Sequence, residues 1–377
     1  KLCSEENFSS LFLQKENVKY YIIAGEASGD LHGSNLMNAI AKQDRAAQFR
    51  VWGGDKMQAS GGEIVKHIKE LAFMGFWEVF SNLFTILNNI KYCKQDIAEW
   101  QPDVVVLIDY PGFNFRLLPF LKSKNFKIVW YIAPQVWAWK ENRTELLKKY
   151  VDKLLVILPF EVDFFKKWEM NAQFVGHPLL DVIEEKISHA LEVKTIALLP
   201  GSRKQEIEKM LPLYIAASKH FPNHEFIVTG MSIHGTAYYE KYLSGSNCKL
   251  SMDATYEVLK KSNAALVTSG TATLETALLR VPQVVCYKGN FISYFIGRML
   301  VKVPFISIVN LVCEKQVVKE LIQYEANETQ IVSELNKILQ PDIRSLILKE
   351  YEMLWQKLGG TGASHHAAMA VVEMAKK

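Results

Sequence analysis

The chain has 377 residues, of which 49% are hydrophobic and 22% are charged, and its formal net charge is +4. This length is too great for one ordinary hydrophobic core and predicts two domains. The small charge excludes the dense basic surface of a nucleic-acid-binding protein, but it is compatible with an anionic ligand or an anionic membrane surface.

Cysteine usage and hydropathy indicate the compartment. The five cysteines are scattered without a Cys-x-x-Cys pair, which is typical of a reducing environment. No apolar stretch reaches the roughly 18 residues that a membrane-spanning helix needs. Residues 1–18 lack the basic-then-apolar order of a signal peptide and are interpreted as an N-terminal extension. We therefore expect a cytoplasmic protein that at most lies on a membrane.

The first strong element is an apolar strand, Tyr20–Ala24, followed by a glycine-rich turn and a helix. Its glycines do not fall in the G-x-G-x-x-G order of a dinucleotide site. Glu26 and Asp30 would repel a diphosphate, so this turn, with Ser28, is better suited to sugar hydroxyls. Alternatively, the two carboxylates simply cap the helix.

Short strands are expected at Phe49–Trp52 and Glu63–Val65. The segment Leu71–Leu87 is apolar on nearly every side of a helix, so it is either deeply buried or apposed to lipid. Glu78 interrupts its apolar surface, so the segment does not span a membrane.

The strand Val104–Ile108 ends in Asp109. Ligands bind beyond the carboxyl ends of parallel strands, so Asp109 is the best candidate for a general base; the alternative is a turn-forming aspartate. After the strand Ile128–Tyr131, Trp137 and Trp139 form either a sugar-stacking platform or ordinary packing.

The first half is predicted to end with a strand near Leu154–Leu158, a helix and His177. His177 either bonds a phosphate or sugar hydroxyl or is structural. The charged run 181–193 has no strand pattern and is interpreted as a linker.

The second half opens with the strand Thr195–Leu199, the turn Pro200–Arg203 and an amphipathic helix. A helix start favours phosphate, Gly201 allows close approach to the backbone beside Ser202, and Arg203 adds a forked cation. The turn predicts a nucleotide diphosphate site; the alternative is a surface turn.

A second turn of this kind follows the strand Ala264–Thr268. Its small residues Ser269, Gly270 and Thr271 face phosphate, and Glu275 one turn into the helix is placed to accept two ribose hydroxyls. Together the two turns strengthen the prediction of a nucleotide site.

Further on, Lys288–Lys302 combines basic residues with an apolar helical face, which favours either an anionic bilayer or the core. Phe305–Val309 is expected to be the last strand, ending at Asn310, and the chain is expected to be helical from Lys315.

Eight segments in this order resemble the motifs of lipid A disaccharide synthases, a family of inverting glycosyltransferases with a GT-B fold. The resemblance covers about residues 19 to 377. The segments are Ala24–Asp30, Met74-Gly75, Ile108–Asn114, Gln135–Trp139, Gly176–Pro178, Leu199–Arg203, Ser269–Glu275 and Asn310-Leu311.

The resemblance implies two Rossmann-like domains that face each other across a cleft. An acceptor and lipid domain is expected at 19–181 and a UDP-sugar domain at 194–345. Helices at 346–377 would pack back on the first domain or swap to another subunit. The oligomeric state, monomer or swapped dimer, stays open.

The implied reaction transfers 2,3-diacylglucosamine from UDP to the 6-hydroxyl of 2,3-diacylglucosamine 1-phosphate (lipid X), on the inner face of the cytoplasmic membrane. Asp109 and Arg203 match the family's essential residues, and Glu275 and Asn310 match its donor-side positions. Glu26, Ser28, Asp30 and His177 are acceptor-side candidates. Gly112 stands where some members carry an acid, so that position cannot assist catalysis.

No cofactor is expected, and because the sequence contains no Asp-x-Asp, we expect no metal site. The charge of the leaving group then falls to Arg203 and backbone dipoles. Two alternatives stay open: a UDP-sugar 2-epimerase of the same fold and a non-catalytic peripheral lipid-binding protein.

Overall fold

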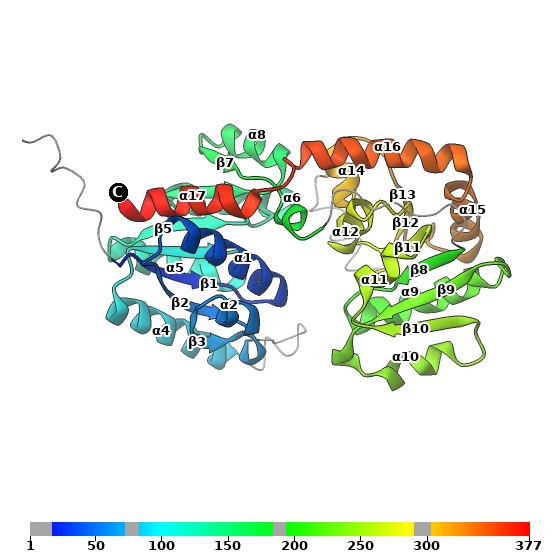
Figure 1. Cartoon of the computed structure of the whole chain (residues 1–377), viewed down its shortest axis with the longest axis horizontal. Helices are drawn as coiled ribbons and strands as arrows, with labels where there is room; N and C mark the ends of the chain where they lie inside the picture. The colour runs from blue at the N-terminus through cyan, green and yellow to red at the C-terminus, as the bar shows by residue number, and fades with distance from the viewer. Residues whose placement is uncertain (1–16, 72–82, 184–193, 290–302) are drawn as a thin grey trace, which may run out of the picture. The chain divides into compact units, whose positions relative to one another are not determined.

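The computed structural model describes residues 17–71, 83–183, 194–289 and 303–377. The chain divides into two compact units. Unit 1 comprises Lys1–Pro178 and Gly362–Lys377, and unit 2 comprises Leu179–Thr361 (Figure 1). The chain thus returns to unit 1 at residue 362, later than the expected residue 346.

Unit 1 is built on a parallel sheet with the order β3-β2-β1-β4-β5-β6-β7 among the described residues. The order reverses between β1 and β4, and ligands of open α/β sheets bind at such switch points. The strands are β1 (Lys19–Ile23), β2 (Gln48–Gly53), β3 (Glu63–His67), β4 (Val104–Ile108), β5 (Lys127–Tyr131), β6 (Lys153–Val156) and β7 (Ala172–Phe174).

Helices cover both faces of this sheet because alternate strand residues point to opposite sides. On one face Tyr20 and Ile22 pack with α1 and α17, and on the other Tyr21 and Ile23 pack with α4, α5, α7 and α8. The helical elements are α1 (Ala27–Gln43), α2 (Asp55–Ala59), η1 (Ile68–Glu70), α4 (Leu83–Trp100), α5 (Pro111–Ser123), α6 (Val136–Trp139), η2 (Glu141–Arg143), α7 (Thr144–Tyr150), α8 (Pro159–Lys167) and α17 (Ala363–Lys376).

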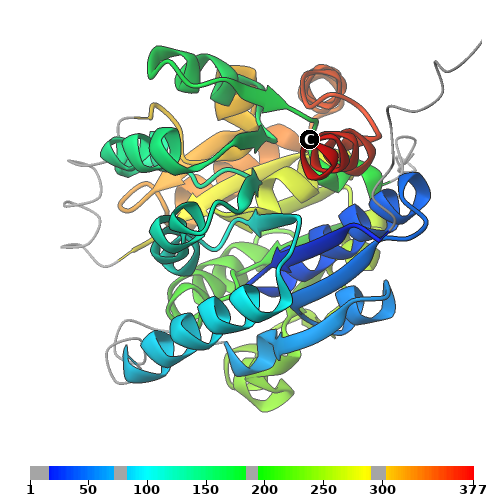
Figure 2. The same ribbon diagram turned by 90° about the vertical axis from the view of Figure 1, so that its left-hand side faces the viewer.

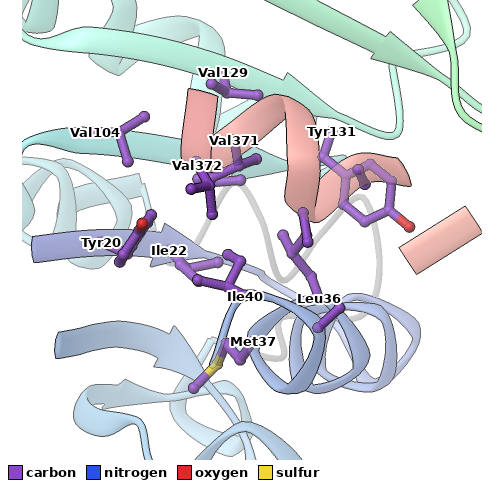
Figure 3. Packing of buried hydrophobic residues seen from close by; sticks show 14 of the residues in the cluster. Tyr20, Ile22, Leu36, Met37, Ile40, Val104, Val129, Tyr131, Val371 and Val372 are labelled. Carbon is purple, nitrogen blue, oxygen red and sulfur yellow. The ribbon is translucent and has the colours of Figure 1, made fainter. Parts of the chain in front are cut away.

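The last helix, α17, belongs to the core of unit 1. Figure 2 shows it in red beside the blue helix α1, and the two helices contact each other along their length. Val371 and Val372 lie among Ile40, Val104 and Val129 (Figure 3). The end of the chain therefore packs against the sheet that carries Asp109.

Unit 2 is also a parallel sheet, with the order β10-β9-β8-β11-β12-β13 among its described residues and a reversal between β8 and β11. Its strands are β8 (Thr195–Leu199), β9 (Glu225–Gly230), β10 (Cys248–Met252), β11 (Ala264–Thr268), β12 (Gln283–Tyr287) and β13 (Lys319–Ile322). The helical elements are η3 (Pro178–Asp181) at the boundary, α9 (Lys204–Ser218), η4 (Ser232–His234), α10 (Thr236–Leu243), α11 (Thr255–Lys260), α12 (Ala272–Leu278), α14 (Ile308–Cys313), α15 (Glu328–Ile338) and α16 (Pro341–Lys357).

The expected last strand at Phe305–Val309 is wrong. Helix α14 begins at Ile308 because Ser307 caps it, accepting a hydrogen bond from the N–H of Asn310 at 3.3 Å. The last strand is instead β13, at the edge of the sheet, where its charged residues are tolerated although a helix was expected there.

Both candidate membrane segments fall largely outside the described residues, at 72–82 and 290–302. In the part of the chain that is described, no helix combines the length and apolarity needed to cross a membrane. Helix α4, which follows the first segment, exposes Phe84 by 81% and Leu87 by 49%.

Candidate active site

Asp109 lies at the switch point of unit 1, directly after β4. Asp109 and Tyr110 both have left-handed backbones, with φ of 43° and 46°. This conformation is strained for residues other than glycine and persists only when the surroundings enforce it. The buried Asn114 side chain donates to the carbonyl of Asp109 at 2.8 Å, and the N–H of Asp109 donates to Tyr131 at 3.2 Å.

Gly25 completes this arrangement from the neighbouring β1–α1 turn. The Tyr110 ring covers Gly25 so closely that a Cβ there would lie 2.3 Å from a ring carbon. The same ring stacks on Phe113 with centroids 5.3 Å apart. The shape of the Asp109 turn therefore requires a glycine at position 25.

The pKa of the Asp109 carboxyl group suits a general base. Burial among protein atoms, followed by the negative charge of Glu26, raises its pKa to about 6. The side chain still keeps solvent-accessible surface. At neutral pH, Asp109 is therefore mostly ionised, reachable and more basic than an ordinary aspartate.

The other acceptor-side candidates separate into two groups. Glu26 and Ser28 are exposed beside Asp109, and Glu26 makes no side-chain cap to α1, so the capping alternative does not apply to it. Asp30 is 4% exposed and accepts hydrogen bonds from the N–H groups of Gly54, Lys56 and Met57 at the start of α2. Asp30, in the first turn of α1, therefore fastens this helix to the start of α2, and its expected role toward the acceptor stays a prediction.

His177 is also buried, with 6% of its surface exposed. Burial and the neighbouring His32 lower its pKa to about 3. Its ring is therefore neutral at physiological pH, so it does not supply the positive charge that a phosphate would need.

Glu161, at the start of α8, is a buried carboxyl group that sequence reasoning missed. It accepts from the indole N–H of Trp137 at 3.0 Å and from the backbone of Ile157 and Leu158. Burial and the charge of Asp109 raise its pKa to about 7, against the lowering effect of these donors. Trp137 is 7% exposed, so it packs and is no sugar platform. The only sequence signal was a glutamate at the third helical position after a proline.

The Gly201–Arg203 turn lies at the switch point of unit 2. Gly201 has φ of 107°, and a Cβ there would lie 2.5 Å from Glu206 Oε2. That oxygen accepts from the N–H groups of Ser202 and Arg203, at 3.1 and 3.2 Å. These two backbone donors, which were expected to face phosphate, are thus taken by Glu206.

Arg203 itself remains available for an anion. Its side chain is 79% exposed, and its Nη1 lies 3.6 Å from Glu206 Oε1, a weak pairing in water. His234 Nε2 lies 2.8 Å from the carbonyl of Ser202 and braces the turn from η4. Glu206 and His234 were not predicted; Glu206 carried the signal of a capping box.

The second turn follows β11, the neighbour of β8. Ser269 Oγ donates to the carbonyl of Ile306 at 3.1 Å, whereas the space around Gly270 is open and Thr271 is exposed. Burial raises the pKa of Glu275, and a hydrogen bond from Tyr256 opposes this rise. Gly270, Thr271 and Glu275 thus follow the strand next to the one that carries the Arg203 turn, while the Ser269 side chain bonds within unit 2.

Asn310 is hydrogen-bonded inside unit 2. It is completely buried, and its Nδ2 donates to Val318 O at 2.9 Å and Glu320 Oε1 at 2.8 Å. Its Oδ1 accepts from the N–H groups of Val317 and Val318. Every polar group of this side chain is therefore occupied, so Asn310 braces α14 against the start of β13, and its expected donor-side role stays a prediction.

We expect Asn310→Ala to lower the free energy of unfolding of unit 2 by about 3 kcal/mol, because buried partners left unsatisfied cost about 1–3 kcal/mol each. Urea unfolding of the variant, beside the exposed control Gln205→Ala, measures this loss. Unchanged stability combined with weaker UDP binding would return Asn310 to the donor site.

The candidate residues thus lie at the carboxyl ends of central strands, one set in each unit. In unit 1, Glu26, Ser28 and Asp109 follow the adjacent strands β1 and β4, and in unit 2 the Gly201–Arg203 turn and Gly270–Glu275 follow the adjacent strands β8 and β11. Among the described residues, no group of three or more His, Cys, Asp or Glu side chains is arranged to hold a metal ion.

Residues 20–373 match the model of the lipid-A-disaccharide synthetase family. The chain belongs to this family. It is 38% identical to the lipid-A-disaccharide synthase of Syntrophus aciditrophicus, covering 94% of this chain and 97% of that one. It is 34% identical to the corresponding protein of Geobacter metallireducens, covering 96% and 98%.

Solved structures place this lipid-A-disaccharide synthetase family member in the GT-B fold. A putative UDP-N-acetylglucosamine 2-epimerase from Listeria monocytogenes aligns with a TM-score of 0.65 at 14% identity, over 95% of this chain and 96% of that one. The calicheamicin glycosyltransferase aligns with a TM-score of 0.61 at 15% identity, over 96% and 99%. At these identities the likeness shows the fold alone, and it confirms the predicted pair of parallel α/β domains.

Proposed function

We propose that this glycosyltransferase moves 2,3-diacylglucosamine from its UDP donor to the 6-hydroxyl of 2,3-diacylglucosamine 1-phosphate, giving a β(1→6) disaccharide 1-phosphate and UDP. The observation that carries the proposal is Asp109, a reachable carboxylate with a pKa of about 6 at the switch point of unit 1. Family membership supports the two lipid substrates.

In this reaction Asp109 takes the proton of the acceptor hydroxyl. The hydroxyl oxygen attacks the anomeric carbon, the bond to the diphosphate oxygen breaks, and its electron pair leaves with UDP. Attack from the side opposite UDP inverts the anomeric centre. A preorganised positive group stabilises the charge that develops on the leaving diphosphate, and Arg203 supplies it.

The donor's nucleotide is assigned to unit 2. Glu275, which accepts a hydrogen bond from Tyr256, is proposed to bind ribose hydroxyls, and the open backbone at Gly270 and Thr271 is proposed to meet the diphosphate. The N–H groups of Ser202 and Arg203 already donate to Glu206. We therefore propose that the Gly201–Arg203 turn binds the diphosphate through the Arg203 guanidinium and not through these two N–H groups.

We also propose that the enzyme acts at the inner face of the cytoplasmic membrane. Two exposed apolar side chains of α4, Phe84 and Leu87, support it. Such side chains favour insertion at a lipid surface, where both acylated substrates would reside. Flotation with anionic vesicles checks this part, and a Phe84→Asp/Leu87→Asp variant that floats as well as the unmodified protein would contradict it.

The reaction is tested with purified protein, both acylated sugars and thin-layer separation, with and without a chelator. We expect UDP and disaccharide only when both lipids are present, and no loss with the chelator. Conversion of UDP-N-acetylglucosamine alone would instead indicate an epimerase, and binding of both lipids without UDP release would indicate a lipid-binding protein. Loss with the chelator would assign the leaving charge to a metal.

A further inference from the structure

Three cationic side chains that the proposed reaction does not use lie near the Asp109 turn. We call Arg116, Lys140 and Arg143 the basic cluster. Arg116 lies on the second turn of α5, the helix that begins directly after Asp109 and Tyr110. Lys140 ends α6 and Arg143 ends η2, both after β5, which is the hydrogen-bonded neighbour of β4. The cluster and Asp109 thus follow the carboxyl ends of two adjacent strands, β4 and β5.

The backbone places Lys140 and Arg143 on one side of a turn. The N–H of Arg143 donates to the carbonyl of Lys140 at 2.9 Å, so the two side chains are three residues apart on a helical surface. The guanidinium of Arg143 lies 5.1 Å from the ring centroid of Phe115, which itself packs on Trp130 at 4.9 Å. This stacking fixes Arg143 against the helix that carries Arg116.

Arg116 directly follows Phe115 and is held at the start of the same helix. Its Nη1 donates to the carbonyl of Gly112, and its charge acts on Tyr110, whose pKa it lowers against the raising effects of burial and Glu26. The side chains of Arg116 and Arg143 are therefore held by a backbone and an aromatic contact, so little of their conformational freedom remains to be lost on binding a ligand.

Two charges of the cluster, those of Arg116 and Arg143, differ from those of nearby lysines. Lys122 on α5 pairs with Asp152 at 2.6 Å, and Lys148 on α7 pairs with Glu169 at 2.8 Å. Within the described ranges, Arg116 and Arg143 form no ion pair closer than 4.0 Å, while burial and the charge of Arg143 lower the pKa of Lys140. The like charges of Lys140 and Arg143 repel each other, and an anion beside them would relieve this repulsion.

We propose that the basic cluster binds the phosphate group of the phosphorylated sugar acceptor. The inference rests on the proposed function, in which Asp109 receives the proton of that acceptor's hydroxyl. Asp109 and Glu26 repel a phosphate, so the acceptor must direct its phosphate away from them. The cluster offers two forked guanidinium groups and one compact ammonium group, which suit phosphate oxygens.

The test compares two acceptors, the 1-phosphorylated acylated glucosamine and the same sugar without its phosphate. In Arg143→Gln and Lys140→Gln variants, we expect KM for the phosphorylated acceptor to rise about 10- to 100-fold, the scale of one hydrogen bond to a charged group. We expect kcat to change little, and the KM for the unphosphorylated acceptor to stay at its value in the unmodified protein.

Lys148→Gln is the matched control, because it removes a paired lysine from the next helix. An equal loss for both acceptors, or no loss for either, would overturn the site. Binding of glucosamine 1-phosphate, measured by calorimetry, provides a readout without turnover and should weaken in Arg143→Gln. An inactive unmodified protein that still shows this weakening would refute the proposed function and not the phosphate site.

Discussion

Asp109→Asn is expected to lower kcat by about 10³-fold while the protein remains folded, because a positioned general base contributes about 10²–10⁴-fold. Asparagine preserves the shape of the side chain but cannot take the acceptor proton. The backbone contacts of the turn, from Asn114 to the Asp109 carbonyl and from Asp109 N–H to Tyr131, do not involve the replaced carboxyl group. Initial rates with both lipid substrates measure the loss.

The pH dependence of the unmodified enzyme gives an independent readout of the same residue. The base must be ionised, so kcat/KM should rise with pH through about 6, the pKa that burial and Glu26 give to Asp109. Glu26→Gln removes the like charge and should move this rise to lower pH. A rate that is unaltered in Asp109→Asn, or a profile that Glu26→Gln leaves unchanged, would contradict the assignment of Asp109 as the base.

Stability should change in the opposite direction from activity. The folded pKa of Asp109, about 6, lies above the unfolded value near 3.9, so ionising this group destabilises the folded protein as pH rises from about 4 to 6. Above pH 6, Asp109→Asn should therefore melt no lower than the unmodified protein. A clearly lower Tm at pH 8 would mean that the carboxylate holds the turn together.

Arg203→Ala is expected to cost about 2–4 kcal/mol of transition-state stabilisation, a loss of about 30- to 1,000-fold in kcat/KM. Its guanidinium is 79% exposed and its pairing with Glu206 is loose, so the free energy of unfolding should hardly change. Single-turnover rates with the UDP donor measure the loss at the chemical step.

A matched control is Lys337→Ala, which removes an exposed, ion-paired cation from the same unit. It should leave turnover intact. Near-normal turnover in Arg203→Ala would show that the leaving diphosphate is stabilised by another group, for which the open turn at Gly270 and Thr271 is the next candidate.

The central strands were predictable because they are buried on both faces. Val104–Ile108 and Ala264–Thr268 are continuous apolar runs, and the structure confirms both. Edge strands lack this signal: Cys248–Met252 is only partly buried and was missed. The short apolar run Phe305–Val309 has no periodicity that separates strand from helix, and the cap at Ser307 decided it.

For the site, the sequence places polar residues at strand ends but does not show their long-range partners. Asp30 accepts hydrogen bonds from Gly54 and Met57, and Asn310 accepts one from Val318, and no local sequence pattern predicts these contacts. Conversely, Glu161 lies inside an amphipathic helix, and its bond to Trp137 across the strand ends carries no local sequence signal.

A crystal structure of Asp109→Asn with the UDP-sugar donor and the phosphorylated acceptor tests the central claim most directly. We predict the acceptor's 6-hydroxyl within about 3 Å of the residue 109 side chain, and the donor diphosphate on the Arg203 guanidinium. A complex in which these two side chains touch different molecules on separate surfaces, with no sugar between them, would contradict the account.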